Sequence, residues 1–322
     1  MPQLVKSGTT LWKYGSYFLG YSRTWVMGNP LNPITSTMGT LSGSCGVVID
    51  YPSTSFPNGR IFVTNYTTST LSIINYSNPY AGSPTVITTA QGLFNNPISL
   101  AIDYPSTAFP NGRIFVLNNG SNNSISVLSY TNPAVGATSI STTQAGLADS
   151  RGIAVDAANN RIFVTNRASN TISILNYSIP TVILNTITQS QGNFSSPYGI
   201  ALDAANARIF VANSVDNTIS ILNYSTPTVT APIKITTTQG KLLGSTGIAL
   251  DAPNNRIYVN NSDNTISIIN YLNPSAGSPT IISATQNGTN NSQGIAIDVP
   301  GNRIFIGNYG SSSVSVLTYN FT

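Results

Sequence analysis

The sequence predicts an all-β protein, and three observations lead to this fold class. A strand-like segment, GIALD or a close variant, recurs six times, at intervals of about 47 residues or, between the first three copies, about 53. Each copy is followed by an RIFV segment, an NTISILNY segment and a Thr-rich segment such as IKITTTQG, with Asn, Gly, Pro and Ser between them. No segment has helical periodicity. Four short strands repeated at this period predict a β-propeller, with one repeat per blade.

Six clear repeats occupy residues 46–322, and each begins with the recurring strand. The six copies of that strand are Gly46–Asp50, Ser99–Asp103, Gly152–Asp156, Gly199–Asp203, Gly247–Asp251 and Gly294–Asp298. The last repeat ends after its third strand, SVSVLTY (Ser313–Tyr319). Its fourth strand therefore has to come from elsewhere in the chain.

Residues 1–45 are less regular, and we expect them to supply an irregular N-terminal blade and the closing strand. In the interpretation we favour, Pro2–Lys6 (PQLVK) is the missing outer strand and residues 9–40 form one more blade. Residues 1–322 are then a single seven-bladed propeller of four-stranded antiparallel blades, closed by pairing of the N- and C-terminal strands. The alternative has six blades, closed by PITSTMG, with residues 1–30 as an appendage. Either closure removes sheet edges that would invite aggregation.

The repeat resembles a known superfamily. The segment IFVTNRASNTISILN (Ile162–Asn176) and its copies are similar to the YVTN/NHL β-propellers, most closely to the YVTN type found in archaeal surface-layer proteins. The resemblance covers about residues 46–322 and weakens before them. It implies a propeller fold and says little about function, because such rings host many unrelated tasks.

Charged residues make up only 7% of the chain, yet many of them recur at one place in the repeat. Each GIALD-type strand ends at an aspartate and the next strand begins at an arginine, so a tight turn would bring the two together. We predict six structural clamps of this kind, each worth about 0–1 kcal/mol if exposed and more if buried. The functional alternative is a ring of carboxylates that binds cations. The pairs are Asp50–Arg60, Asp103–Arg113, Asp156–Arg161, Asp203–Arg208, Asp251–Arg256 and Asp298–Arg303.

The chain offers few groups for catalysis. It has no Glu and no His, and only Asp149, Asp216 and Asp263 remain beside the clamp aspartates. His-activated nucleophiles are therefore excluded, and Cys45 is alone, which rules out an internal disulfide. We predict that the protein is not an enzyme and that it binds no cofactor and no metal ion. The alternative is a lactonase-like hydrolase whose calcium is held by Asn side chains and backbone carbonyls.

The residue before each GIALD-type strand is expected to line the mouth of the central channel. These residues all differ, while the scaffold around them repeats. Such variety is typical of side chains that merely fill the channel, or of a pocket for one asymmetric ligand. The six residues are Cys45, Ile98, Arg151, Tyr198, Thr246 and Gln293.

Several loops are longer than the repeat requires. YPSTSFPNGR (Tyr51–Arg60) and YPSTAFPNGR (Tyr104–Arg113) extend the first hairpin of two adjacent blades, and three loops before the fourth strand are also extended. Both turn types emerge on the same face of an up-and-down blade, so this face is our candidate contact surface. The alternative is that the aromatic side chains tuck under their own loops. The candidates are Tyr51, Phe56, Tyr80, Tyr104 and Phe109.

Charge and hydropathy limit the setting of the protein. The net charge is +4, but the cations are scattered or beside an aspartate, which excludes the basic face that nucleic acids need. No apolar run could span a membrane, and the first residues do not resemble a secretory signal. N-x-S/T sequons permit glycosylation outside the cell. A surface this poor in charge suits an exposed setting. A virion protein fits both this setting and the lack of a recognisable secretory signal, because it is made in the cytoplasm and then exposed outside the cell.

We therefore expect a non-enzymatic propeller displayed on a virus particle or another extracellular surface. It would be a structural, docking or host-attachment module that makes protein or glycan contacts. Its partners would be other structural proteins of a virion or cell envelope, or a host surface protein or glycan. The alternatives are a channel-mouth binder of a small ligand, the calcium-dependent hydrolase above, and an intracellular protein-interaction scaffold.

Overall fold

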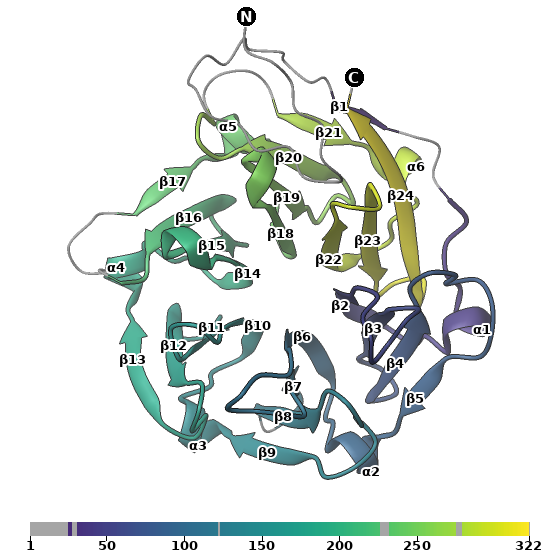
Figure 1. Ribbon diagram of the computed structural model, residues 1–322. Coiled ribbons are helices and arrows are strands. Elements are labelled where there is room, and N and C mark those ends of the chain that lie inside the picture. The colour runs from purple at the N-terminus through teal and green to yellow at the C-terminus, as the bar shows by residue number, and fades with distance from the viewer. Residues whose placement is uncertain (1–24, 28–30, 122, 226–231, 275–278, 322) are drawn as a thin grey trace, which may run out of the picture.

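The computed structural model describes residues 25–27, 31–121, 123–225, 232–274 and 279–321. These residues form six four-stranded antiparallel sheets arranged as the blades of a ring (Figure 1). The all-β propeller is therefore confirmed, in its six-bladed form. The seven-bladed count that we favoured is not confirmed.

The strands occupy equivalent places in the six blades. From blade 1 to blade 6, the innermost strands are β2 (Ser44–Asp50), β6 (Pro97–Asp103), β10 (Ser150–Asp156), β14 (Pro197–Asp203), β18 (Ile248–Asp251) and β22 (Ser292–Asp298). The second strands are β3 (Arg60–Asn65), β7 (Arg113–Asn118), β11 (Arg161–Asn166), β15 (Arg208–Asn213), β19 (Arg256–Asn260) and β23 (Arg303–Asn308). The third strands are β4 (Thr70–Asn75), β8 (Ser124–Ser129), β12 (Thr171–Asn176), β16 (Thr218–Asn223), β20 (Ile266–Asn270) and β24 (Ser313–Phe321). The outer strands are β5 (Thr85–Ile87), β9 (Thr138–Ser141), β13 (Ile183–Ile187), β17 (Ile233–Ile235), β21 (Thr280–Ile282) and, in blade 6, β1 (Trp25–Met27).

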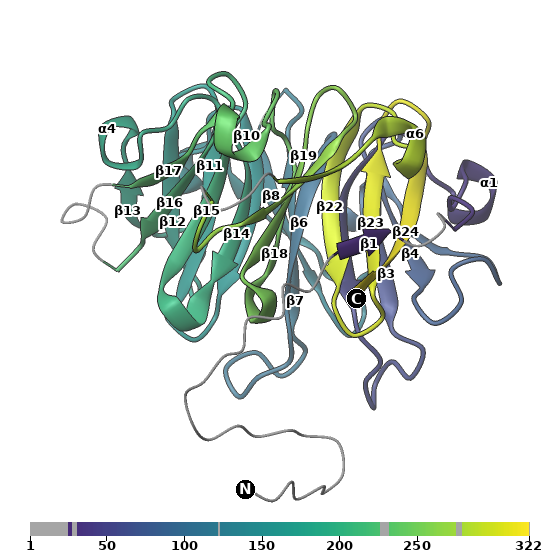
Figure 2. The ribbon, with the colours of Figure 1, turned by 90° about the horizontal axis from the view of Figure 1, so that it is seen from above.

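Short helices follow the outer strands, and two 3-10 turns lie in the first hairpins of blades 4 and 5. The helices are α1 (Ser36–Gly39), α2 (Thr89–Gly92), α3 (Thr142–Ala145), α4 (Gln189–Gly192), α5 (Thr237–Gly240) and α6 (Ala284–Asn287); the turns are η1 (Ala204–Asn206) and η2 (Ala252–Asn254). In the side view these helices lie toward one face, which we call the helix face (Figure 2). The long hairpins of blades 1 and 2 project from the opposite face, which we call the loop face (Figure 2). Among the described residues, no helix has the length and apolar character needed to cross a membrane.

The ring is closed by the N-terminal part of the chain. Strand β1 pairs with β24, with Trp25 opposite Phe321, and Ile34 forms a separate bridge with Val314. The six-bladed alternative placed the closing strand in PITSTMG, and Ile34 of that segment does pair with blade 6. Most of the closing strand, however, comes from residues 25–27. The strand expected at Pro2–Lys6 lies outside the described residues.

No room is left for a seventh blade between the first and last repeats. A Cβ atom added to Gly294 of β22 would lie 2.3 Å from the carbonyl oxygen of Cys45 in β2. The innermost strands of blades 6 and 1 are therefore direct neighbours. Of the extra blade expected in residues 9–40, the described parts (25–27 and 31–40) contain only strand β1, which belongs to blade 6, the Ile34 bridge and helix α1.

The first hairpin of each blade turns through a residue with left-handed backbone geometry. The residues at this position have φ between 50° and 62° and directly precede the clamp arginine: Gly59, Gly112, Asn160, Ala207, Asn255 and Asn302. Glycine and asparagine tolerate this conformation best, which explains why they recur in the otherwise variable turn.

The core lies between neighbouring blades. Ile61, Phe62 and Val63 of β3 are all fully buried, because both faces of the second strand pack against other blades. This burial on both faces is why the RIFV segment reads as a continuous apolar run and not as an alternating one. Phe62, for example, belongs to a cluster with Leu100 and Val116 of blade 2.

A buried asparagine closes the helix-face end of each blade. In blade 1, the Asn65 amide donates to the hydroxyls of Thr70 and Ser72, and its oxygen accepts from the backbone N–H of Ser42. The other five blades repeat these contacts with Asn118, Asn166, Asn213, Asn261 and Asn308. Since buried polar groups need partners, this network explains why an Asn followed by two hydroxyl residues, Thr or Ser and then Ser, recurs in every repeat.

Candidate functional site

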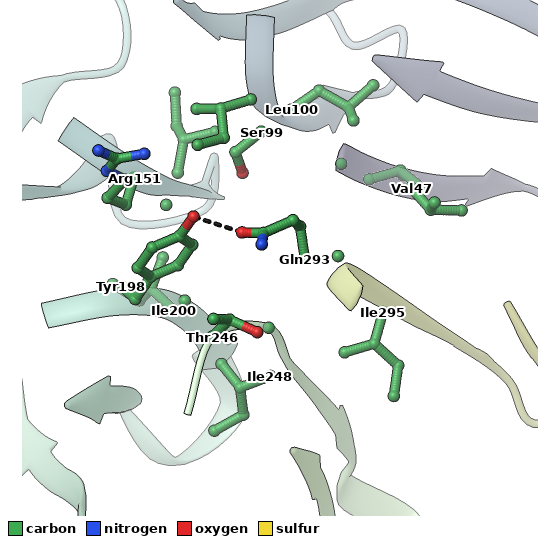
Figure 3. Close-up of a pocket in the computed structure, with 18 of the residues that line it drawn as sticks. Val47, Ser99, Leu100, Arg151, Tyr198, Ile200, Thr246, Ile248, Gln293 and Ile295 are labelled. Atoms are coloured by element: carbon green, nitrogen blue, oxygen red, sulfur yellow. Dashed lines mark hydrogen bonds between the residues drawn. The ribbon is translucent and has the colours of Figure 1, made fainter. Parts of the chain in front are cut away.

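The predicted channel-mouth residues line two adjacent cavities, which share several lining residues. The deeper cavity, about 250 Å³, lies among the innermost strands and is lined by Arg151, Tyr198, Thr246 and Gln293, among others (Figure 3). A cavity of about 200 Å³ lies at the helix face. Its lining residues are Cys45, Tyr66, Ile98, Arg151, Tyr198, Asn291, Gln293 and Tyr309. The sequence thus identified much of this site, but Tyr66, Asn291 and Tyr309 were not among the candidates.

A hydrogen bond crosses the channel between the two cavities. The hydroxyl of Tyr198, on blade 4, donates to Oε1 of Gln293, on blade 6, at 2.5 Å (Figure 3). The Gln293 amide in turn donates to Asn291 at 2.9 Å. Both bridging side chains line both cavities, so they form a floor beneath the mouth.

Arg151 is held in place by an acidic residue on its own blade. The Nη2 atom of Arg151 lies 2.6 Å from Oδ1 of Asp149, whose other oxygen lies 2.6 Å from Nε of Arg167. Burial alone would raise the pKa of Asp149, but the hydrogen bond from Asn119 and the two guanidinium groups outweigh it and hold the pKa below its usual value. The carboxylate is therefore charged at neutral pH, and it fixes the guanidinium 5.4 Å from the Tyr198 ring.

Asp149, Arg167 and Asn119 were not predicted as site residues, although the sequence carries a signal for the first. Asp149 occupies a left-handed position that recurs in every blade, where the other residues are Gly43, Asn96, Ser196, Gly244 and Asn291. It is the only acid at this position. An acid where the repeat otherwise has Gly, Asn or Ser marks a local requirement, which here is the neighbouring Arg151.

Cys45 lines the mouth but has the properties of an inert thiol. Burial raises its pKa to about 12, and the lowering effect of Arg151 is smaller. Because the thiolate is the reactive form, this side chain is not a nucleophile at neutral pH. Within the described part of the chain, no group of three or more His, Cys, Asp or Glu residues is placed to hold a metal.

The aspartates and arginines predicted to form clamps face one another in all six hairpins. The strand register pairs each aspartate directly with its arginine. Ion pairs of 2.7–2.9 Å join Asp50–Arg60, Asp103–Arg113, Asp203–Arg208 and Asp298–Arg303. In blade 3, Asp156 accepts from Asn159 at 2.8 Å, and Arg161 donates to the Tyr224 carbonyl at 3.1 Å. In blade 5, Asp251 accepts from Asn254 at 2.9 Å.

The clamps also connect neighbouring blades, which the sequence did not indicate. The hydroxyl of Tyr130, in blade 2, donates to Asp50 of blade 1 at 3.1 Å, and Arg60 donates to the Tyr130 carbonyl at 3.0 Å. Equivalent contacts join Tyr177 to Asp103 and Tyr76 to Asp298. The six aspartates are at most 4% exposed, so these are buried contacts that fasten the neighbouring blades they join.

On the loop face, the five candidate aromatic residues fall into two groups. Phe56 lies over the Arg60 guanidinium, 3.3 Å from its ring centroid, and Phe109 covers Arg113 in the same way. These rings shield the clamps of blades 1 and 2. Tyr51, Tyr80 and Tyr104 are 36%, 38% and 49% exposed. Their rings remain open to a partner.

The exposed tyrosines sit on loops that are already ordered. The Tyr51 hydroxyl donates to the Ile297 carbonyl of blade 6 at 3.4 Å, and the Tyr80 hydroxyl donates to the Asn32 carbonyl at 2.8 Å. The Tyr104 ring packs edge-on against Tyr130, at a centroid distance of 5.7 Å. These contacts reduce the side-chain entropy that a partner would have to overcome.

Two of the sequons are closed to modification in the folded chain. Asn65 and Asn260 are fully buried. The Asn65 amide bonds to Thr70 and Ser72, and the Asn260 amide bonds to the Gly294 carbonyl at 3.2 Å. A glycan at either position would have to displace core contacts.

Comparisons with known proteins show the fold alone. The sequence matches no protein-family model and no curated protein. The structure resembles the PQQ-bound aldose sugar dehydrogenase of Streptomyces coelicolor, with TM-score 0.62 and 11% identity over 92% of this chain and 99% of that chain. It also resembles the β-propeller domain of Cps50 (Swd1) from Myceliophteria thermophila, with TM-score 0.58 and 10% identity over 90% and 99% of the two chains. A chain of a nidogen/laminin complex matches with TM-score 0.56 and 14% identity over 74% and 80%.

These neighbours support a β-propeller, and the resemblance to YVTN/NHL repeats stays an expectation from the sequence. At identities of 14% or less, the activities of the neighbours do not transfer to this chain. The site has to be interpreted from its own residues.

We expect the protein to lose stability in alkaline solution. Partial burial is the main cause that raises the pKa of Tyr51, Tyr104 and Tyr198 to about 12, whereas an unfolded tyrosine titrates near about 10. The folded state therefore holds these protons more tightly, so stability is unchanged below about pH 10 and falls as the pH rises toward 12. Urea midpoints measured against pH, beside the absorbance of ionised tyrosine, check this. Tyr198→Phe should show a smaller fall, and a constant midpoint up to pH 12 would contradict the expectation.

Proposed function

We propose that this propeller is a non-enzymatic docking module displayed on a virus particle or cell surface. The observation that carries the proposal is the set of three exposed tyrosines, Tyr51, Tyr80 and Tyr104, on ordered loops of adjacent blades. Tyrosine is enriched where proteins contact partners, because a large rigid ring buries much area at low entropic cost. The inert Cys45 thiol supports a role without catalysis.

The proposed partners are other structural proteins of a virion or cell envelope, or a host surface protein or glycan. The low charged fraction, 7%, supports an exposed setting over an intracellular one. Mass spectrometry of the native source, fractionated into virions, cell envelope and cytosol, tests this setting. A chain found only in the cytosol would overturn the proposed display.

Tyrosine substitutions test whether the loop face makes the contacts. We expect Tyr80→Ala combined with Tyr104→Ala to weaken co-sedimentation with the virion or envelope fraction by at least about tenfold, as loss of interface hot spots does. Leu93→Ala is the control, because Leu93 is 45% exposed but lies at the end of α2, on the helix face, and lines neither channel cavity. Protease or glycosidase treatment of the fraction distinguishes protein from glycan partners. Equal loss of binding in the control would contradict the assignment to the loop face.

A further inference from the structure

Arg151 supplies the charge on the walls of the channel cavities. Among the described residues that line either cavity, it is the single charged side chain. The nearby carboxylate of Asp149 is shared with Arg167. Two guanidinium groups against one carboxylate leave the cluster with a net positive charge, so the mouth attracts an anion.

One donor of Arg151 is not satisfied. Its Nη2 atom is paired with Asp149 at 2.6 Å, but its Nε–H is buried and has no hydrogen-bond partner in the described part of the chain. Buried donors are nearly always paired. Arg151 lines both cavities and lies beside Tyr198 along their wall (Figure 3), so its positive charge borders the space in which an anion would bind.

The other walls of the mouth indicate the size and character of the ligand. The rings of Tyr66 and Tyr309, from blades 1 and 6, meet edge-on with centroids 5.7 Å apart, and the amides of Asn291 and Gln293 lie in the same wall. The mouth cavity of about 200 Å³ is smaller than the roughly 300–1,000 Å³ of a typical drug-sized site. The Tyr198–Gln293 bridge limits its depth. These walls fit a small ligand that presents hydroxyl groups to the amides and a flat face to the rings.

We propose that the channel mouth binds a small hydroxylated carboxylate of the size of an acidic monosaccharide. Its carboxylate pairs with Arg151, since charge-assisted hydrogen bonds to guanidinium are the strong ones. Asp149 and Arg167 position that guanidinium. The site lies on the helix face, opposite the proposed docking surface, so it goes beyond the docking function and can fail or succeed independently of it.

Saturation-transfer NMR with D-glucuronate and D-glucose as probes tests the proposal on the full chain. We expect a signal from glucuronate and none from glucose, which has the same ring without the carboxylate. Arg151→Gln should weaken glucuronate binding at least tenfold. Lys241→Gln, which removes a positive charge elsewhere on the helix face, at the end of α5, should leave binding unchanged.

Three additional measurements distinguish loss of the ligand site from loss of the fold and from general anion binding. The thermal unfolding of Arg151→Gln shows whether the fold survives, and Arg151→Lys, which keeps the charge but lacks the Nε–H, should bind with intermediate affinity. Absence of a glucuronate signal, equal signals from both sugars, or unchanged binding by Arg151→Gln would overturn the proposal. Full displacement of glucuronate by equimolar sulfate would identify a general anion site and overturn the carboxylate class.

Discussion

Replacing Asp50 with alanine is expected to lower the free energy of unfolding by about 3–5 kcal/mol, the usual cost of removing one partner from a buried ion pair. Asp50 is 1% exposed and accepts from Arg60 at 2.8 Å and from Tyr130 at 3.1 Å. Its loss leaves the Arg60 guanidinium buried without its counter-charge and removes the acceptor that holds blade 2 to blade 1. Urea unfolding followed by circular dichroism measures the change.

Asp263→Ala is the control for this prediction. Asp263 is exposed and accepts only from Thr265 within its own turn, among the contacts that the structure describes, so its loss should cost less than about 1 kcal/mol. A double-mutant cycle of Asp50→Ala with Tyr130→Phe isolates the contact between blades. Equal destabilisation by the two aspartate variants would show that the clamps are ordinary turn contacts.

Replacing Gly294 with alanine is expected to lower the free energy of unfolding by about 3 kcal/mol, the upper end of the usual cost of overpacking. The added Cβ would lie 2.3 Å from the Cys45 carbonyl oxygen and 3.0 Å from the Cα of Gly46. Both neighbours are backbone atoms of blade 1, so no side-chain rotation relieves the clash. The innermost strands of blades 6 and 1 would have to separate, and thermal unfolding reports the loss.

Ser99→Ala provides the matched control, because Ser99 occupies the equivalent place in blade 2 and already carries a Cβ. In blade 2 the register between β6 and β7 shifts between Pro97 and Ser99, whereas in blade 6 the corresponding shift runs from Ser292 to Ile295. This local difference accommodates the side chain. We expect Ser99→Ala to change stability by less than about 1 kcal/mol. A Gly294→Ala variant as stable as the natural chain would contradict the tight contact between the two blades.

The repeat predicted the blades because each repeat carries its own pattern of strands and turns. The blade count depended on residues that carry no such pattern. Strand β1 has three residues, Trp25–Met27, and its place is set by the partner strand β24, which runs on to Phe321. A strand whose position depends on a distant partner leaves little periodic signal in its own sequence.

The site was predictable to a similar extent and for a similar reason. The mouth residues could be found because they vary where the scaffold repeats. The contacts that support Arg151 could not be predicted from the sequence. Its partner Asp149 also accepts from Asn119 of blade 2 and from Arg167, which follows the second strand of blade 3. Likewise, the clamp pairs were evident within each hairpin, but their contacts with Tyr130 and its equivalents cross from one repeat to the next.

The pairing of β1 with β24 also orders events during synthesis of the chain. Blades 1 to 5 are each made from one continuous stretch, so each can form soon after its residues leave the ribosome. Blade 6 needs residues 25–27 together with residues 313–321. Strand β1 is made first and therefore stays without its partner β24 until almost three hundred further residues have been added. Closing so long a loop is entropically costly and slow, so ring closure is the step at which an unfinished chain is most exposed to mispairing.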